Sequence, residues 1–212
     1  MGLPGAVYDI IADEDITTGD GTVRVPKDTV VETLTTGEDA TATSGLLYLG
    51  RYRLEERQAP YGMVLETEPV YVELVYAGQE VEVTQTAVGI YDERQKVAID
   101  LEKLMEIDEL FNIGMAGEYK GVSFGLYAAH DIVALDGSVI PADGLLEVVS
   151  IEPVEGEQGR YTAAFAADLP FASFYVQERT TSKEYILSSQ QYPVVFAYAG
   201  QDIALVSITA ND

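Results

Sequence analysis

The stretch "QKVAIDLEKLMEID", residues 95–108, alternates between two kinds of side chain. Every second residue from Val97 onward is apolar except Lys103, and the residues between them are mostly acidic. Strict alternation of this kind is typical of a β-strand with one buried face. We therefore expect a strand over 97–107, in preference to a short amphipathic helix over 101–111, with a charged amine in its buried row.

The rest of the chain is organised by an internal repeat. Segment 52–83 aligns with segment 174–205 at an offset of 122 residues, and segment 6–16 aligns with segment 122–132 at an offset of 116. Both copies contain short runs of β-branched and aromatic residues, punctuated by Gly, Asp, Thr and Pro, as strands and turns are. The sequence therefore predicts an all-β protein made of two tandem β-sandwiches.

The repeat also predicts where the two domains begin and end. We expect the first domain over residues 1–93 and the second over residues 94–212. Because residue 1 aligns with residue 117, the first copy has no counterpart of the strand at 97–107 and would lack its N-terminal strand. We expect the chain to belong to a longer array, and the first domain to expose a sheet edge that invites a donated strand.

Composition excludes several classes of partner. The 212 residues include 36 acidic and 12 basic ones, a formal charge of −24, which opposes binding to nucleic acid or to anionic lipid. The chain contains no run of 18 apolar residues, so the sequence predicts no membrane-spanning helix. With no cysteine and one histidine, a zinc site is not expected, and no phosphate-binding loop or nucleophile motif predicts a cofactor or substrate turnover.

Four stretches share a further pattern. They are "LPGAVYDI" (3–10), "LGRYRLEERQAPYGM" (49–63), "GVSFGLYAA" (121–129) and "FYVQERTTSKEY" (174–185). An aromatic, an aliphatic and a glutamate occupy alternate positions in two of these stretches, and the first copy continues with Ala-Pro-x-Gly. The pattern resembles the Cna B-type, or SpaA-type prealbumin-like, repeats of Gram-positive cell-surface proteins and pilins. This resemblance implies prealbumin-like, Ig-like β-sandwiches and a location outside the cell, at the cell wall.

The resemblance also implies an intramolecular isopeptide bond, formed between a first-strand lysine and a last-strand Asn or Asp with the help of a buried glutamate. In the second copy it implies Lys103 as the lysine and Glu178 as the glutamate. The acceptor is then Asn211, Asp212 or a residue beyond this chain. Burial disfavours the charged form of both groups, so the amine would be nucleophilic and the glutamate able to donate a proton. The alternative for Lys103 is an edge-strand lysine whose ammonium reaches water.

In the first copy, Glu56 and Asp92 match the promoting glutamate and the acceptor, but the strand that would carry the lysine is absent. A surface glutamate and a solvated linker acid are the alternatives for these two residues. A separate cluster, Asp13, Asp15 and Asp20 in "DEDITTGDG", resembles a calcium loop only weakly. It lacks the EF-hand spacing and terminal Glu, so a solvated turn is the preferred interpretation.

Together these features predict a structural stalk or spacer of a bacterial cell-surface adhesin or pilin-like protein, whose partners are neighbouring domains of the same protein. Two alternatives stay open. One is an adhesin module that binds a host protein or glycan, which an exposed aromatic patch not shared by the two copies would favour. The other is an accessory domain of a secreted enzyme. No enzymatic activity is expected beyond autocatalytic formation of the isopeptide bond.

Overall fold

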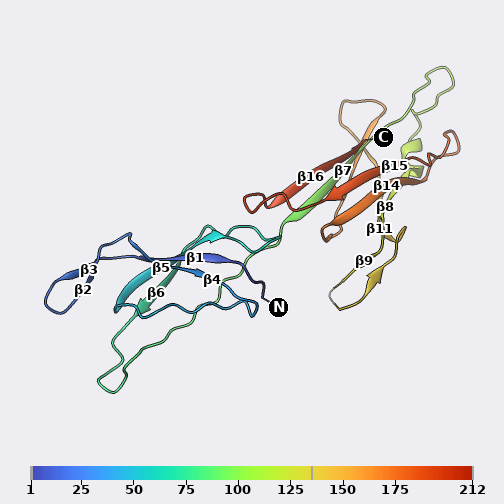
Figure 1. Ribbon diagram of the computed structural model, residues 1–212. Coiled ribbons are helices and arrows are strands. Elements are labelled where there is room, and N and C mark those ends of the chain that lie inside the picture. The colour runs from blue at the N-terminus through green and yellow to red at the C-terminus, as the bar shows by residue number, and fades with distance from the viewer. Residues whose placement is uncertain (1, 135, 212) are drawn as a thin grey trace. The chain divides into compact units, whose positions relative to one another are not determined.

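The computed structural model describes residues 2–134 and 136–211, and these are strands joined by turns and loops (Figure 1). The all-β class predicted from the sequence is confirmed. Among the described residues, no helix has the length and apolar character needed to cross a membrane. The chain divides into two compact units: a first unit of Met1–Gln95 with Gly200–Ala204, and a second unit of Lys96–Ala199 with Leu205–Asp212.

The second unit contains two four-stranded sheets. One sheet has the strand order β11-β8-β14-β15 and the other the order β12-β13-β7-β16. All pairs are antiparallel except β7 with β16, which are parallel. The elements of this unit are β7 (Lys96–Leu104), η1 (Glu118–Gly121), β8 (Ser123–Ala128), β9 (Ile132–Val133), β10 (Val139–Ile140), β11 (Leu145–Ser150), β12 (Glu152–Pro153), β13 (Arg160–Phe165), β14 (Ala172–Thr180), β15 (Gln191–Phe196) and β16 (Leu205–Asn211).

Strand β7 confirms the strand predicted from the alternating stretch, although it ends at Leu104 rather than at residue 107. Ile99 and Leu101 are buried and Asp100 is exposed, as the alternation requires. β7 lies between β13 and β16, so its backbone pairs on both sides. It is therefore the strand that joins the two halves of its sheet.

The first unit contains a four-stranded sheet of order β4-β1-β5-β6 and a small hairpin of β2 with β3. This order repeats the order β11-β8-β14-β15 of the second unit, strand for strand. The elements are β1 (Val7–Ala12), β2 (Ile16–Thr17), β3 (Val23–Val25), β4 (Val30–Thr35), β5 (Gly50–Gln58) and β6 (Val70–Leu74). The shared register is close: Ala12 lies opposite Tyr52 as Ala128 lies opposite Phe174.

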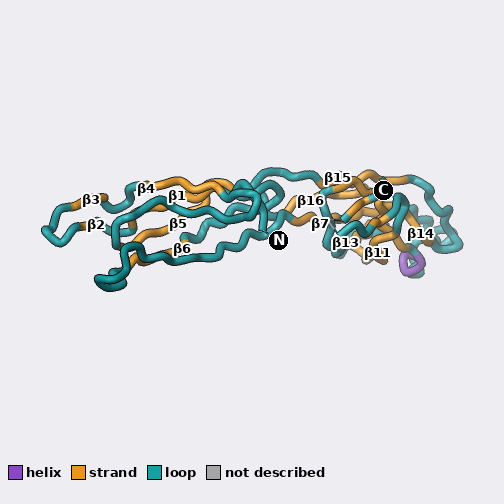
Figure 2. Tube along the Cα trace, turned by 60° about the horizontal axis from the view of Figure 1, so that its bottom comes forward, coloured by secondary structure: helices purple, strands orange, loops and turns teal. Residues whose placement is uncertain are grey.

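The second sheet has no counterpart among the described residues of the first unit. Residues 36–49 follow β4 in the way that the segment with β12 and β13 follows β11. Residues 83–89 align with β16. Neither 36–49 nor 83–89 forms a strand. Figure 2 shows long loops running beside the strands of the first unit. The sequence predicted the loss of one strand. The structure goes further, because the segments on both sides of that strand are unpaired as well.

The packing of the two units differs accordingly. The core cluster of the second unit has sixteen buried residues drawn from both sheets, whereas that of the first unit has four. Matched positions show the same effect, since Val194 is fully buried and its counterpart Val72 is partly exposed. The inner face of the first unit's sheet is therefore covered only in part.

Candidate functional site

Both units hold a glutamate at the same place in the sheet, beside a β-bulge. In the first unit Tyr8 lies opposite Glu56, and the pairing then skips Arg57. In the second unit Phe124 lies opposite Glu178, and the next residue is again skipped. Bulges of this kind bend a strand and re-aim its side chains, and they are common beside functional sites. The repeat therefore preserves a local backbone distortion as well as a residue type.

A backbone hydrogen bond holds each glutamate in the same way. Glu56 Oε2 accepts a bond of 2.8 Å from the Glu66 amide, and Glu178 Oε2 accepts one of 2.9 Å from the Ser188 amide. The two donors are related by the offset of 122 residues. Glu56 Oε1, by contrast, is buried and has no hydrogen-bond partner.

Asp92 is the second carboxylate of the first-unit site. Two backbone hydrogen bonds of 2.8 and 3.0 Å hold segment 93–95 against segment 62–64. Asp92 thereby lies within electrostatic range of Glu56 and Glu66, and its Oδ1 is buried without a hydrogen-bond partner. A buried acceptor that makes no hydrogen bond destabilises the fold, so two such oxygens in one site need an explanation.

The titration of this site follows from its burial. Burial raises the pKa of Glu56 and the charge of Asp92 adds to the rise, while hydrogen bonds from the Glu66 amide and the Tyr8 hydroxyl oppose it. The pKa of Asp92 is raised by burial first and then by the charge of Glu66. The pKa of the Tyr8 hydroxyl is raised by burial and by the charges of Glu56 and Asp92. All three shifts have the sign that burial and neighbouring negative charge produce.

In the second unit, Lys103 lies beside the counterpart of Tyr8. It lies in β7, and its Nζ is 5.9 Å from the centroid of the Phe124 ring, within the range of a cation–π contact. Phe124 belongs to the facing sheet and is the strand partner of Glu178, which is 5% exposed. The lysine therefore reaches from one sheet to the other, toward the position of the glutamate.

The register of β16 bears on the choice of acceptor. β16 runs parallel to β7, and the backbone of Asn211 pairs with Glu102 rather than with Lys103. The next residue, Asp212, lies outside the described residues.

Two residues of the first-unit site were missed in the sequence analysis. Tyr8 and Glu66 both influence the pair of Glu56 and Asp92. Tyr8 aligns with Phe124, so the repeat itself carried a signal, namely a hydroxyl added at an otherwise apolar position. Glu66 had no such signal, because its role depends on the loop after β5.

The carboxylates of the possible calcium cluster make separate local contacts. Asp13 makes an ion pair of 3.0 Å with Arg51, Asp15 accepts a backbone hydrogen bond, and Asp20 accepts bonds from two neighbouring threonines that lower its pKa. Within the described ranges, no group of three acidic, histidine or cysteine residues lies close enough together to hold a metal ion. The preferred interpretation of the segment, a solvated turn, fits these contacts.

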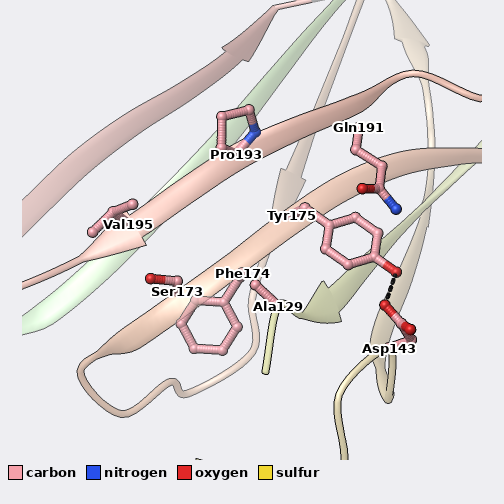
Figure 3. Close-up of a pocket in the computed structure, with 8 residues that line it drawn as sticks. All are labelled: Ala129, Asp143, Ser173, Phe174, Tyr175, Gln191, Pro193 and Val195. Carbon is pink, nitrogen blue, oxygen red and sulfur yellow. Dashed lines mark hydrogen bonds between the residues drawn. The ribbon is translucent and has the colours of Figure 1, made fainter. Parts of the chain in front are cut away.

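The outer face of the second unit's sheet carries a shallow depression of about 390 Å³ over β14 and β15 (Figure 3). At its edge the Tyr175 hydroxyl donates a 2.9 Å hydrogen bond to Asp143 Oδ1, and the Tyr175 ring stacks on Tyr127 with centroids 5.1 Å apart. Tyr127 and Tyr175 align with Ile11 and Arg53, so the first unit has no such aromatic pair. This patch is not shared by the two copies.

Comparison with known proteins identifies the fold. Residues 1–87 match the family described as SpaA, a prealbumin-like fold domain. No curated protein sequence matches the chain. Among solved structures, the TIE protein of Bacillus anthracis is similar over 100% of this chain, with a TM-score of 0.52 and 16% identity. The chain spans only 31% of that protein's length.

Two further structures are similar along nearly the whole chain. A C-terminal fragment of the pilus adhesin SpaC from Lactobacillus rhamnosus GG is 12% identical, with 98% of this chain and 88% of the fragment covered and a TM-score of 0.42. The minor pilin GBS52 of Streptococcus agalactiae is 16% identical, with 100% and 84% covered and a TM-score of 0.30. The family match over residues 1–87 and the fold agree with the resemblance predicted from the sequence.

Proposed function

We propose that this chain is a spacer segment of a Gram-positive cell-surface protein of the pilin or adhesin type, whose second unit is closed by a covalent bond from Lys103. The prealbumin-like domain and the similarity to pilin and adhesin structures support the spacer role and an extracellular, cell-wall location. The observation that carries the covalent part is the reach of Lys103 from β7 to Phe124, the strand neighbour of Glu178.

The bond we propose is an amide between the Lys103 amine and a side chain at the end of β16. The neutral amine attacks the carboxyl carbon of Asp212, the carbon–hydroxyl bond breaks, and one water leaves. If Asn211 is the acceptor, the leaving molecule is ammonia. Glu178 relays the proton between the amine and the leaving group, and the fold supplies the proximity that such a reaction needs.

The first unit fits the same chemistry in part. Glu56 and Asp92 supply the promoting carboxyl and the acceptor, and both are partly buried, as the reaction requires. The amine would have to come from a strand outside the described residues. We therefore propose Glu56 as the promoting residue and Asp92 as the acceptor of a bond whose donor is a separate segment.

A spacer benefits from this arrangement because load reaches it through its first and last strands. Resistance to forced unfolding depends on the rate of unfolding rather than on equilibrium stability. β7 and β16 are neighbours in one sheet, and a bond between them would prevent their separation. The unit would then transmit force without the loss of its terminal strands.

The test is the intact mass of the full chain at isotopic accuracy. We expect a mass lower than the sequence mass by one water, or by one ammonia if Asn211 is the acceptor. Lys103→Ala and Glu178→Gln should abolish this deficit after the mass of each substitution is taken into account. Lys96→Ala, at the exposed start of the same strand, should keep it. A parent chain of unmodified mass would contradict the covalent proposal.

A second candidate function is recognition of a glycan on the outer face of the second unit. The stacked Tyr127 and Tyr175 and the depression beside them support it, because aromatic rings next to polar groups suit sugar binding and the first unit has no equivalent. A glycan array probed with the full chain tests this candidate. Binding that is lost in Tyr175→Ala and kept in Tyr71→Ala, an exposed tyrosine of the first unit, would support it, and a blank array would count against it.

A further inference from the structure

A glutamine fixes one turn within the first unit. This unit includes the segment Gly200–Ala204, and Gln201 of that segment binds the end of β5 and the loop that follows it. The Gln201 side chain accepts a hydrogen bond of 3.0 Å from the Ala59 amide and donates one of 3.3 Å to the Arg57 carbonyl. The Gln201 carbonyl accepts a bond of 3.0 Å from the Leu65 amide. One residue thus makes three hydrogen bonds to backbone groups of this loop.

The second unit repeats the loop that receives this glutamine. The Met63 amide donates to the Pro60 carbonyl, and at the offset of 122 residues the Tyr185 amide donates to the Ser182 carbonyl, both over 3.0 Å. The bulge and the anchored glutamate at the start of the loop are also the same in both units. The counterparts of the three groups that bind the glutamine are the Thr181 amide, the Arg179 carbonyl and the Leu187 amide.

This loop is uncovered in the second unit. Ile186 and Leu187 are 94% and 51% exposed. Their counterparts in the first unit, Val64 and Leu65, are half-buried. Within the described residues, the amides at positions 181 and 187 donate to no protein group. Residues 179–187, which we call the docking loop, therefore present apolar side chains beside backbone donors.

The first unit carries a second copy of the glutamine and its turn. The sequence Tyr-Ala-Gly-Gln at 76–79 is repeated 122 residues later. The glycine has a positive φ in both copies, 106° at Gly78 and 103° at Gly200, a conformation that glycine adopts readily. In both copies the amide three residues after the glycine closes the turn with a 3.3 Å hydrogen bond to the glycine carbonyl. Residues 76–81, the glutamine turn, therefore have the backbone shape of the bound turn, and their Gln79 is exposed.

The docking loop and the glutamine turn carry opposite charge. Arg179 and Lys183 outweigh Glu184 in the docking loop, whose sign is thus positive in a chain with only 12 basic residues. The glutamine turn contains Glu80, and Glu82 follows it; both glutamates are exposed. Since the whole chain has a formal charge of −24, a locally positive surface is where an acidic turn of another copy would meet least repulsion.

We propose that copies of this chain associate head to tail, with the glutamine turn of one copy bound to the docking loop of the next. Gln79 takes the place of Gln201. Its side chain accepts a hydrogen bond from the Thr181 amide and donates one to the Arg179 carbonyl, and its own carbonyl accepts one from the Leu187 amide. The contact joins two different surfaces, so a copy can bind a second copy through one and a third copy through the other. This goes beyond the spacer role and does not depend on the crosslink.

The contact between copies is expected to be weak. In the first unit, Gln95 Nε2 adds hydrogen bonds of 3.0 and 2.6 Å to the carbonyls of Gly200 and Ile203. These two bonds are not part of the proposed contact, which relies on the three bonds of one glutamine and on the apolar side chains of the docking loop. Association should therefore appear as the concentration rises toward the millimolar range.

Nuclear magnetic resonance of the full, isotope-labelled chain over a dilution series tests this. We expect the amide signals of Thr181 and Leu187 and the side-chain amide signals of Gln79 to shift together with concentration, while translational diffusion slows. Gln79→Ala should weaken association by about tenfold or more, because it removes two of the three hydrogen bonds. Gln85→Ala, at another exposed glutamine of the same unit, should have no effect.

Mixing two variants tests the direction of the contact. Gln79→Ala keeps the docking loop, and Leu187→Pro keeps the glutamine turn but removes one amide donor. Each variant alone should associate weakly, whereas a mixture should form heterodimers in which the docking-loop signals of the Gln79→Ala chain shift. Ile186→Asp replaces the proline variant if that variant does not fold, because it places a negative charge at an exposed side chain without altering the backbone.

Three results would overturn the proposal. One is a set of docking-loop signals that do not change with concentration. Another is association that Gln79→Ala leaves intact, which would assign it to a different surface. The third is a mixture of the two variants that associates no better than either variant alone. None of these results depends on the mass of the second unit, so the covalent proposal would stand or fall separately.

Discussion

The two units carry the same four-stranded sheet, but only the second unit covers it with another sheet. The order, the register and the bulge beside the glutamate are alike in both, so the first sheet does not require the second in order to be specified. The core does require it, because the core cluster of the second unit has sixteen buried residues and that of the first unit has four. The segments on both sides of β7 form strands in the second unit, and the matching segments of the first unit do not.

The site chemistry divides between the units in a complementary way. The second unit has the lysine close to the position of its glutamate, and the first unit has a glutamate and an aspartate with unpaired buried oxygens. The comparison teaches that the sheet shared by the two units provides the glutamate of the site. The lysine comes from β7, in the sheet that only the second unit has.

The largest expected effect comes from breaking the crosslink in the second unit. A Lys103 bond to residue 212 would close a loop of about 108 residues, and by analogy with disulfide loops its loss should cost about 4–5 kcal/mol. Lys103→Ala should therefore lower the midpoint of thermal unfolding of the second unit and leave the first unit unchanged. Calorimetry checks this, with Lys96→Ala as the control. An unchanged midpoint would mean that no bond contributes to stability.

Cavity formation should distinguish the two units at a matched position. Val194→Ala removes methyl groups from a fully buried site and should cost about 2 kcal/mol, whereas Val72→Ala, at a partly exposed site, should cost about half of that or less. Urea-dependent hydrogen exchange gives the free energy of unfolding of each unit. Equal losses would contradict the difference in burial.

The pH dependence of the first unit is a smaller effect with a definite sign. The pKa values of Glu56 and Asp92 are raised in the folded state, from model-peptide values of 4.5 and 3.8, so the folded state holds protons that the unfolded state releases. Their stabilising contribution is complete below the unfolded values and is lost as the pH rises through the folded ones. We expect the first unit to be more stable in mild acid than at neutral pH.

Two variants check this origin. Glu56→Gln and Asp92→Asn cannot ionise, so each should flatten the profile of stability against pH, and Glu80→Gln should leave it as it is. A first unit whose stability rises with pH in this range would show that the two carboxyl groups are paired with a cation in solution.

The smallest expected effect concerns the outer face of the second unit. Tyr175→Phe removes the hydrogen bond to Asp143 but keeps the stacked ring, and it should cost about 0.5–1 kcal/mol. Urea unfolding of the second unit measures this. Since Arg53 replaces Tyr175 in the first unit, that unit should be unaffected, and a loss in both units would indicate a non-specific effect.

Much of this architecture was accessible from the sequence. The alternation around Lys103 predicted β7, because a period of two survives in any strand with one buried face. The repeat predicted that Glu56 and Glu178 share one environment. Both inferences rest on local or self-similar patterns, which a single sequence contains.

The rest depends on pairing over long distances. Alternating sequence predicts a strand only if a partner is present, so the unpaired state of 83–89 could not be read from its residues. The bulge at Arg57 and the charge of Glu66 near Asp92 arise from register and loop geometry, for which the sequence carried no pattern. Asp212, one candidate acceptor, lies outside the described residues.

The central claim is that the lack of a counterpart of β7 among the described residues, and not a difference in the shared sheet, separates the two units. Residue-resolved hydrogen exchange of the full chain tests it most directly, through matched amides such as those of Leu54 in β5 and Val176 in β14. We predict that amides of β1 and β5 exchange at least tenfold faster than their counterparts in β8 and β14, because the first unit opens at a lower free energy. Equal protection at matched positions would contradict the account, since it would show that the first unit is as well closed as the second.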